Sequence, residues 1–508
     1  LPLLAILCLA AVAVGQQAKP AKEPAKPPIT VSKKTTWITE PLNDDGTVNY
    51  VAAADAILRK GVTPENNAAG LLLRAFGKDA IREEVRDEII KRLGLTDFLD
   101  ANEAIIRLMD YARLGFNEGN DPDGELGDKA ASDFDLAAAE FRRHPFAPDA
   151  NVPRLAAYVK RNERALALIV EASHRPRYYV PFIAPPGKAG MADAAFCLRS
   201  HSLLAIPGAL SLRAALNARE GKFDAAINDL LTLRRLSVVF RQAGLMIDGF
   251  LAIAMDQTAI RGAIDLAVSG QLDKRQARAL LDGLAEVALT PMPSQFMDPC
   301  ERFMLLDQFC GLAKGSPVPT DANNLSGRPA SRVDYDRLCR LTNEVFGKIR
   351  AADALPTFQA RDEARSAIVS PPSEDLVGLI LFDPSKFRRM EAEEPQRLTR
   401  MLEGLAWGPP CRQTGNMVEK SRALAVLARL AAALAVYHAD HGKYPDQLGA
   451  IAPAVIPAVP NDPFNDKPFT YRRTDKGYIL YSVGVDMKDD GGKSQGYGRG
   501  PDLVVEAK

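Results

Sequence analysis

The sequence predicts a mainly α-helical protein that ends in a small α+β domain, with one helix packed on a short antiparallel sheet. Alanine and leucine are abundant, whereas aromatic residues make up only 7% of the 508 residues. Such a composition favours helices over large sheets. Helical segments follow one another over 37–411, most regularly over 150–290, and three short strand-like runs follow residue 467. The expected order is therefore a helical body, 37–411, and a C-terminal domain, 412–508.

The charges of the chain are balanced, with 64 Lys and Arg against 64 Asp and Glu. A nucleic-acid-binding protein needs clustered excess positive charge to neutralise phosphates. No nucleic-acid partner is therefore expected.

The N-terminal segment predicts export. Leu1–Val14 is an apolar run too short to span a bilayer, which takes about 20 residues, and Ala13-Val14-Gly15 is a small-x-small cleavage site. We interpret 1–15 as a signal peptide that lacks its Met and basic start. The alternative is an uncleaved N-terminal membrane anchor. No other transmembrane helix is expected, and the mature protein is expected to be periplasmic or extracellular.

A Lys/Pro/Ala-rich stretch, 16–36, follows the signal segment and has too few apolar residues to fold alone, so it is expected to be a linker. Five cysteines remain beyond the signal segment. Cys300, Cys310 and Cys339 are near enough in sequence for a disulfide in an oxidising compartment. Five is an odd number and the spacings match no zinc motif, which favours buried free thiols.

Within the body, Thr63 and Pro64 predict a helix start and Gly77 its end. The stretch G-V-T-P-E-N-N-A-A at 61–69 resembles the start of a group of exported bacterial proteins of unknown function. The pattern from Ala218 through Gly221 to Ala226 resembles the turn of a tetratricopeptide-like helix pair, and Ser269-Gly270 repeats it weakly. We expect helical hairpins packed in solenoid fashion, whose surface binds a protein partner.

No catalytic or cofactor-binding residue can be assigned from a motif. The five histidines lie outside H-E-x-x-H, and no nucleophile-elbow or phosphate-binding loop is present. His174, next to Arg175 and Arg177, could hold an anion, but a surface cluster is the favoured interpretation. The acidic loop 117–128 fails as an EF-hand because Leu126 stands where Gly is required.

The C-terminal domain begins with an amphipathic helix from Glu419, which Gly442 ends. Strands are expected at 468–473, 478–483 and 502–505. His438 and His441, at the end of the helix, have the spacing of a metal pair, but we assign them to a helix-end signature instead.

The ordered residues of this domain resemble the globular part of the major pseudopilin of type II secretion systems. They are Tyr437, Gly442, Tyr444-Pro445, Asp462-Pro463, Pro468-Phe469, Tyr471, Tyr478, Leu480-Tyr481-Ser482, Gly484, Asp486, Asp490-Gly491-Gly492 and Asp502. The resemblance covers about 85 residues. It implies a calcium-binding loop, with Asp486 and Asp502 as the principal ligands, Asp490 as a third, and backbone carbonyls completing the site. The alternative is a hydrated Asp/Gly turn that needs no ion. Unlike a pilin, this chain has a large body before the helix and lacks the helix's membrane-inserted half, which argues against an ordinary filament subunit.

The sequence thus favours an exported, non-enzymatic protein with a helical interaction body and a calcium-stabilised, pseudopilin-like C-terminal domain. One alternative is an exported hydrolase with a cleft between body and C-terminal domain. A further alternative, an accessory component of a type II secretion-like apparatus, depends on the resemblance alone.

Overall fold

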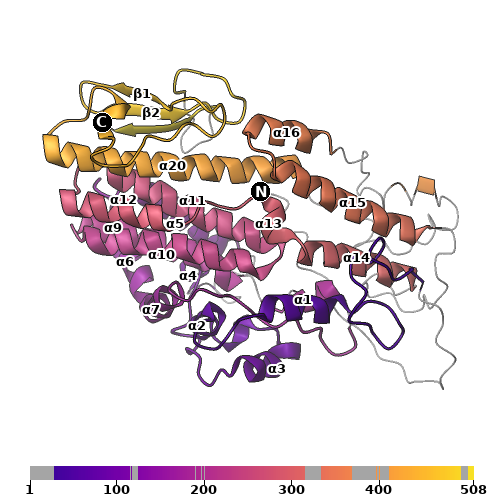
Figure 1. Ribbon diagram of the computed structural model, residues 1–508. Coiled ribbons are helices and arrows are strands. Elements are labelled where there is room, and N and C mark those ends of the chain that lie inside the picture. Colours follow the sequence, from indigo (N-terminus) through magenta and orange to yellow (C-terminus); the bar gives the residue numbers. More distant parts are fainter. Residues whose placement is uncertain are drawn as a thin grey trace.

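The computed structural model is mainly helical, with a three-stranded antiparallel sheet near the C-terminus, as expected (Figure 1). It describes residues 28–114, 116, 124–188, 190–195, 197–198, 201–314, 333–368, 396–397, 400, 411–493 and 501–507. The helices of the first half are α1 (Tyr50–Arg59), α2 (Ala68–Phe76), α3 (Glu83–Leu93), α4 (Leu108–Ala112), α5 (Glu125–Arg143), α6 (Val152–Arg161), α7 (Glu163–Ala172), α8 (Met191–Ala195), α9 (His201–Arg219) and α10 (Phe223–Phe240). Those of the second half are α11 (Met246–Val268), α12 (Lys274–Glu286), α13 (Pro293–Met297), α14 (Cys300–Ala313), α15 (Tyr335–Asp353), α16 (Phe358–Ser366) and α20 (Cys411–His441).

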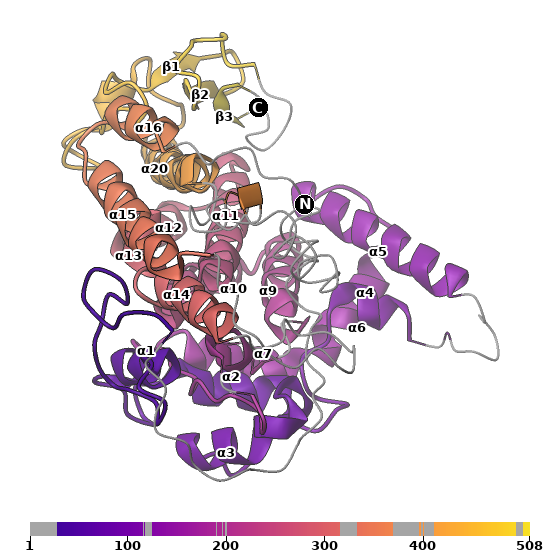
Figure 2. The same cartoon turned by 90° about the vertical axis from the view of Figure 1, so that its right-hand side faces the viewer.

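The long helix α20 joins the two parts of the molecule. It packs against α11 and α12 of the body on one side and against the sheet on the other (Figures 1 and 2). The stretch 423–436 is buried almost all round, and a helix that is apolar on every face belongs in a core. One continuous cluster of buried side chains runs from Ala214 and Ile260 of the body through Leu427 to Leu480 of the sheet.

By length and composition α20 could cross a membrane, and it is the one such helix among the described residues. In its most apolar window, 67% of the residues are buried inside the protein. Its apolar character is therefore accounted for by its place in the core.

The sheet has the order β1 (Thr470–Arg473), β2 (Tyr478–Ser482) and β3 (Leu503–Ala507), with both pairs antiparallel. In the central strand, Leu480 pairs with Tyr471 on one side and with Val505 on the other. All three strands lie within two residues of the predicted ranges.

The two predicted tight turns of the body are present. Gly221 (φ 73°) separates α9 from α10, which pack against each other, and Gly270 (φ 68°) precedes α12. Asp273 caps α12 by accepting a hydrogen bond from the backbone N–H of Gln276. These contacts show helix pairs; their stacking as a solenoid stays a prediction.

Two predicted helix starts were wrong. Helix α20 begins at Cys411 and not at Glu419. Helix α2 begins at Ala68 and not at Pro64, because Asn67 is its N-cap and also donates to the carbonyl of Tyr179 at 2.9 Å. Helix α4 is short, since backbone N–H groups before it donate to carbonyls of α2. Helices α13 and α14 are separated around Pro299, which has no N–H to donate. Residues 384–395 and the loop 117–123 lie outside the described part of the chain.

The first described residues, at the end of the expected linker, are packed against the body. Ile29 is buried, the backbone N–H of Thr30 donates to Asp336 at 2.8 Å, and Asn343 donates to the carbonyl of Lys34 at 3.0 Å. The signal segment and residues 16–27 lie outside the described residues.

Among the described cysteines the free-thiol prediction is confirmed. Cys197, Cys300, Cys310 and Cys339 are buried and unbridged. Burial also raises the pKa of each thiol, and that of Cys300 rises to about 12.

Candidate functional site

The Asp/Gly loop links β2 to β3, and a close approach of two backbone segments shapes its base. Gly484 has a left-handed φ of 69°, and a Cβ atom at this position would lie 2.1 Å from the carbonyl oxygen of Pro501. Only glycine fits there. This close contact between Gly484 and Pro501 places the next residue, Asp502, at the base of the loop.

Asp502 has the side chain that is most strongly placed for a cation. The residue is fully buried; its Oδ2 accepts a hydrogen bond from the backbone N–H of Gly492 at 2.8 Å, whereas its Oδ1 has no hydrogen-bond partner among the described residues, which leave out 494–500. Burial raises the pKa of Asp502, and the charges of Asp490 and Asp489 add to this effect. A buried carboxylate oxygen without a hydrogen-bond partner destabilises the folded state, and a bound cation would offset this destabilisation.

The three predicted ligands are not equally placed. Asp490 is half-buried, and its charge contributes to the raised pKa of Asp502. Asp486 is exposed, and its Oδ1 accepts from the backbone N–H of Lys488 at 3.2 Å, in a local turn. Asp489, which the sequence argument did not select, accepts from the hydroxyl of Tyr481 at 2.9 Å.

The donor set at this loop has the chemistry that calcium prefers, namely carboxylate oxygens in a Gly-rich loop whose carbonyls can turn inward. No group of three or more His, Cys, Asp or Glu side chains arranged for a metal is found among the described residues, which leave out 494–500 of this loop. Asp502 and Asp490 are thus the residues that would hold the ion.

The arginines beside His174 already have partners. Arg175 pairs with Glu171 at 3.5 Å, and Arg177 donates to the carbonyl of Lys60 at 2.7 Å. Burial, and then the charge of Arg235, lowers the pKa of His174. These contacts match the favoured interpretation of a surface cluster.

The two histidines at the end of α20 pack on tyrosines of the pseudopilin-like signature. His438 stacks on Tyr444 with ring centroids 4.5 Å apart, and His441 stacks on Tyr437 at 3.9 Å. Tyr444 in turn packs edge-on against Tyr478 of β2. His438 therefore takes part in fixing the helix end to the sheet through Tyr444, whereas His441 packs within α20.

A carboxylate pair in the body was missed by the sequence argument. Asp248, in the first turn of α11, lies near Glu301, in the first turn of α14, whose Oε2 accepts from the backbone N–H of Met246 at 3.1 Å. Burial, and then the charge of Glu301, raises the pKa of Asp248 to about 7. Burial likewise raises the pKa of Glu301. Neither residue lies in a motif, so only the packing of α11 on the chain around α14 reveals the pair.

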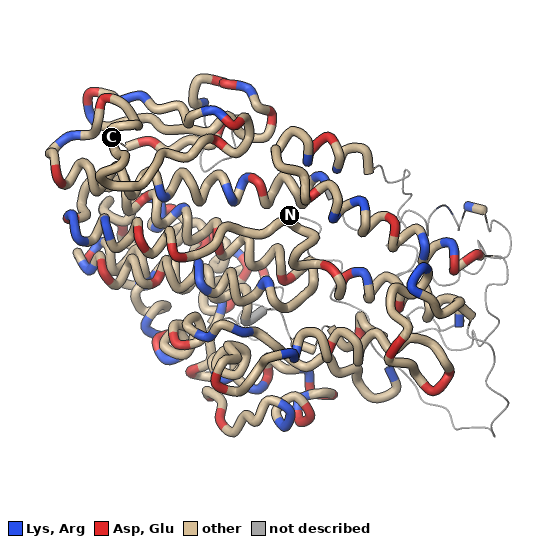
Figure 3. Tube along the Cα trace, viewed as in Figure 1, with Lys and Arg blue, Asp and Glu red and all other residues tan. Residues whose placement is uncertain are grey.

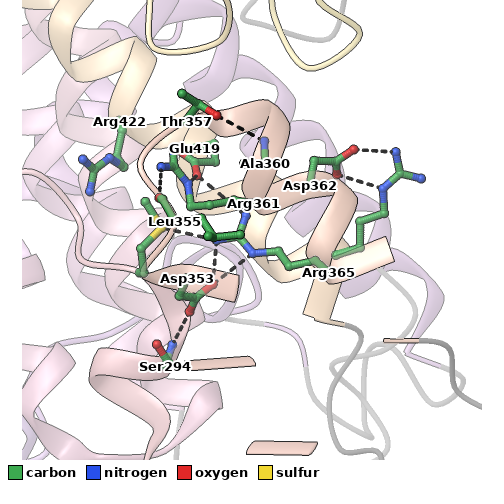
Figure 4. A network of polar contacts seen from close by, with 12 residues as sticks. Ser294, Asp353, Leu355, Thr357, Ala360, Arg361, Asp362, Arg365, Glu419 and Arg422 are labelled. Carbon is green, nitrogen blue, oxygen red and sulfur yellow. Dashed lines mark hydrogen bonds and ion pairs between the residues drawn. The ribbon is translucent and has the colours of Figure 1, made fainter. Parts of the chain in front are cut away.

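A buried ion-pair network joins the start of α20 to the body (Figure 4). Glu419 of α20 accepts from Nε of Arg361 at 2.6 Å and lies 3.6 Å from Arg365, which donates twice to Asp353 of α15. Gly415 makes room for this network, because a Cβ there would lie 2.5 Å from the Arg365 guanidinium. Two arginines and two carboxylates thus balance in charge at the joint of α15, α16 and α20.

No protein-family profile, curated protein or solved structure matches this chain. The argument for function therefore rests on the residues themselves.

Proposed function

We propose that this is an exported, non-enzymatic protein whose helical body binds a protein partner and whose pseudopilin-like C-terminal domain is stabilised by calcium. The observation that carries the proposal is the orphaned Oδ1 of buried Asp502 inside an Asp/Gly loop. Export rests on the N-terminal signal-like segment alone. The shared core along α20 supports a C-terminal domain that is a fixed part of the body and does not move independently.

Exposed apolar side chains support a partner site in the first half of the body. Of the twelve large hydrophobic residues that are exposed in the described part of the chain, six fall within 109–146, in or beside α4 and α5. They are Met109, Leu114, Phe116, Leu126, Leu136 and Phe146. Such a local concentration of exposed apolar groups is typical of interaction sites, because covering it with a partner is favourable. Charged side chains of both signs are interspersed along the rest of the chain (Figure 3).

Affinity capture from the native envelope tests the partner site. We expect the wild type to capture a defined protein, and a Leu114→Glu/Leu136→Glu variant to lose it, since both side chains are at least 60% exposed. The matched control is Ile57→Glu, an exposed apolar residue on α1, which should capture as well as the wild type. Equal capture by all three proteins, or no capture by the wild type, would contradict this part of the proposal.

The carboxylate pair favours a second candidate, an exported hydrolase. Asp248, with a pKa raised to about 7, and Glu301, with a pKa that is also raised, could act together as general acid and general base. The pair lies within the helical body, whereas the sequence argument placed a cleft beside the C-terminal domain. Hydrolysis of ester, peptide or glycoside substrates that disappears in both Asp248→Asn and Glu301→Gln would favour this candidate. Equal rates in both variants and the wild type would remove it. An accessory role in a type II secretion-like apparatus has no support beyond the resemblance.

A further inference from the structure

Three groups of buried arginines in this chain differ in how their charge is compensated. In the network at the start of α20, Arg361 and Arg365 face Asp353 and Glu419, so two positive charges meet two negative charges. A second group places Arg302 and Arg350 on one carboxylate, that of Asp298. In this second group the excess positive charge is stabilised in two other ways.

In the second group, aromatic rings and solvent supply the missing compensation. The Arg302 guanidinium lies 3.8 Å from the ring centroid of Trp37 and 4.9 Å from that of Phe346, so it gains cation–π stabilisation. Arg350 has a side chain that is 57% exposed and is therefore solvated by water.

The third group lacks both kinds of stabilisation, the aromatic rings and the solvent. Arg234 of α10 and Arg241, just beyond its end, share the single carboxylate of Asp256 on α11, at 3.0 and 3.9 Å. The three side chains are only 1%, 6% and 1% exposed. Among the described residues, no aromatic ring is recorded over either guanidinium. One positive charge is thus left without a counter-charge in the interior.

The hydrogen bonds of this group show the same imbalance. Besides its two ion pairs, Asp256 accepts from the hydroxyls of Thr290 at 3.3 Å, Ser421 at 3.4 Å and Ser237 at 3.5 Å. Within the described part of the chain, both terminal nitrogens of Arg234 are buried without a hydrogen-bond acceptor, and Nε has only its ion pair with Asp256. Burial lowers the pKa of Arg234 and lowers that of Arg241 to about 10, but both guanidinium groups stay protonated at neutral pH. Buried unpaired donors of this kind are costly.

We propose that a small monovalent anion of the size of chloride binds in the interior between α10, α11 and α20, accepting hydrogen bonds from the terminal nitrogens of Arg234. A monovalent anion would neutralise the net charge of Arg234, Arg241 and Asp256, and it would accept hydrogen bonds from the two unpaired terminal nitrogens of Arg234. Because Ser421 belongs to α20, an occupied site stabilises the joint between the body and the C-terminal domain. The site is independent of the calcium proposal.

Thermal unfolding in potassium chloride and in potassium gluconate, at equal ionic strength, tests the site, because an anion that binds only the folded state raises Tm with its concentration. We expect the wild type to melt several degrees higher in chloride. Arg234→Met leaves Arg241 and Asp256 as a balanced pair, so its Tm should be the same in both salts. The matched control, Arg302→Met, removes an equally buried arginine and should keep the chloride effect.

Crystals soaked in bromide give a second readout that does not depend on stability. An anomalous peak within hydrogen-bonding distance of the Arg234 guanidinium is expected, and it should vanish in Arg234→Met. A wild-type Tm that is the same in both salts, a chloride effect that persists in Arg234→Met, or the absence of a bromide peak would each overturn the proposal.

Discussion

The carboxylate of Asp462 holds the end of β2 at Ser482. Its Oδ1 accepts from the Ser482 hydroxyl at 2.9 Å, and its Oδ2 accepts from the backbone N–H of Val483 at 2.9 Å. Asp462 and Ser482 are both buried. Asp462 and the end of β2, which are separate in sequence, therefore form one structural unit at the base of the Asp/Gly loop.

Replacing Asp462 should destabilise the C-terminal domain. Asp462→Ala leaves two buried donors unmet and removes the bond from Phe464 as well. We expect a loss of about 3 kcal/mol in the free energy of unfolding, measured by urea denaturation. Asp475→Ala, on an exposed turn, is the control and should change stability by less than about 0.5 kcal/mol. A similar value for both variants would contradict the role given to Asp462.

Gly484→Ala should be far more damaging than Gly491→Ala. Both glycines have a left-handed φ, 69° and 75°, but only at Gly484 would a Cβ collide with backbone, while Gly491 faces open space. We expect about 1 kcal/mol for Gly491→Ala and a loss of folded C-terminal domain for Gly484→Ala. Near-equal unfolding midpoints for the two variants would contradict the close contact between the Pro501 carbonyl and Gly484.

Removing Glu419 should be costly because its partners are buried. Glu419→Leu leaves Arg361 without its carboxylate partner in the interior, for which we expect a loss of about 3–5 kcal/mol. The exposed pair of Arg275 and Asp224 offers a comparison, since solvent screens this ion pair and Arg275→Ala should change the free energy of unfolding far less. Chemical denaturation of both variants measures the difference, and a mild effect of Glu419→Leu would contradict the importance of the network.

Stability should fall as the pH rises from about 4 to about 7, in part because of Asp248. Its pKa is about 7 in the folded protein, against an ordinary value of 3.8, so the folded state binds more protons between these values. The protonated carboxyl of Asp248 therefore favours the folded state. This stabilisation is fully present below the ordinary pKa of 3.8 and is lost as the pH rises past the folded-state pKa of about 7. We compare the free energy of unfolding at about pH 5 and about pH 8 in the wild type and in Asp248→Asn. The decrease between the two pH values should be about 2 kcal/mol larger in the wild type. An identical pH dependence in both proteins would refute the raised pKa.

Local signals in the sequence were enough to predict the C-terminal elements. The apolar spacing of α20, Gly442 at its end and the alternation in Tyr478–Ser482 all act within a few residues. The body was predicted less well where distant contacts decide the outcome. Asn67 became a helix cap because it also binds Tyr179, more than a hundred residues away.

The buried charges could not have been predicted from the sequence. Nothing local distinguishes Arg234 or Asp248 from a surface residue on a helix, because their burial depends on how α10, α11 and α14 pack. The calcium ligands were predicted as a set from the resemblance. Of these three, Asp502 is the buried residue, and its burial depends on the approach of Pro501 to Gly484.

Thermal unfolding with calcium and with a chelator, in one buffer, tests the central claim most directly. We expect calcium to raise the Tm of the wild type by several degrees, because it binds only the folded loop. Asp502→Asn should lose this shift entirely, Asp490→Asn should lose most of it, and Asp486→Ala should keep the larger part because this side chain is exposed. A wild-type Tm that is the same with calcium and with chelator would contradict the calcium-stabilised domain.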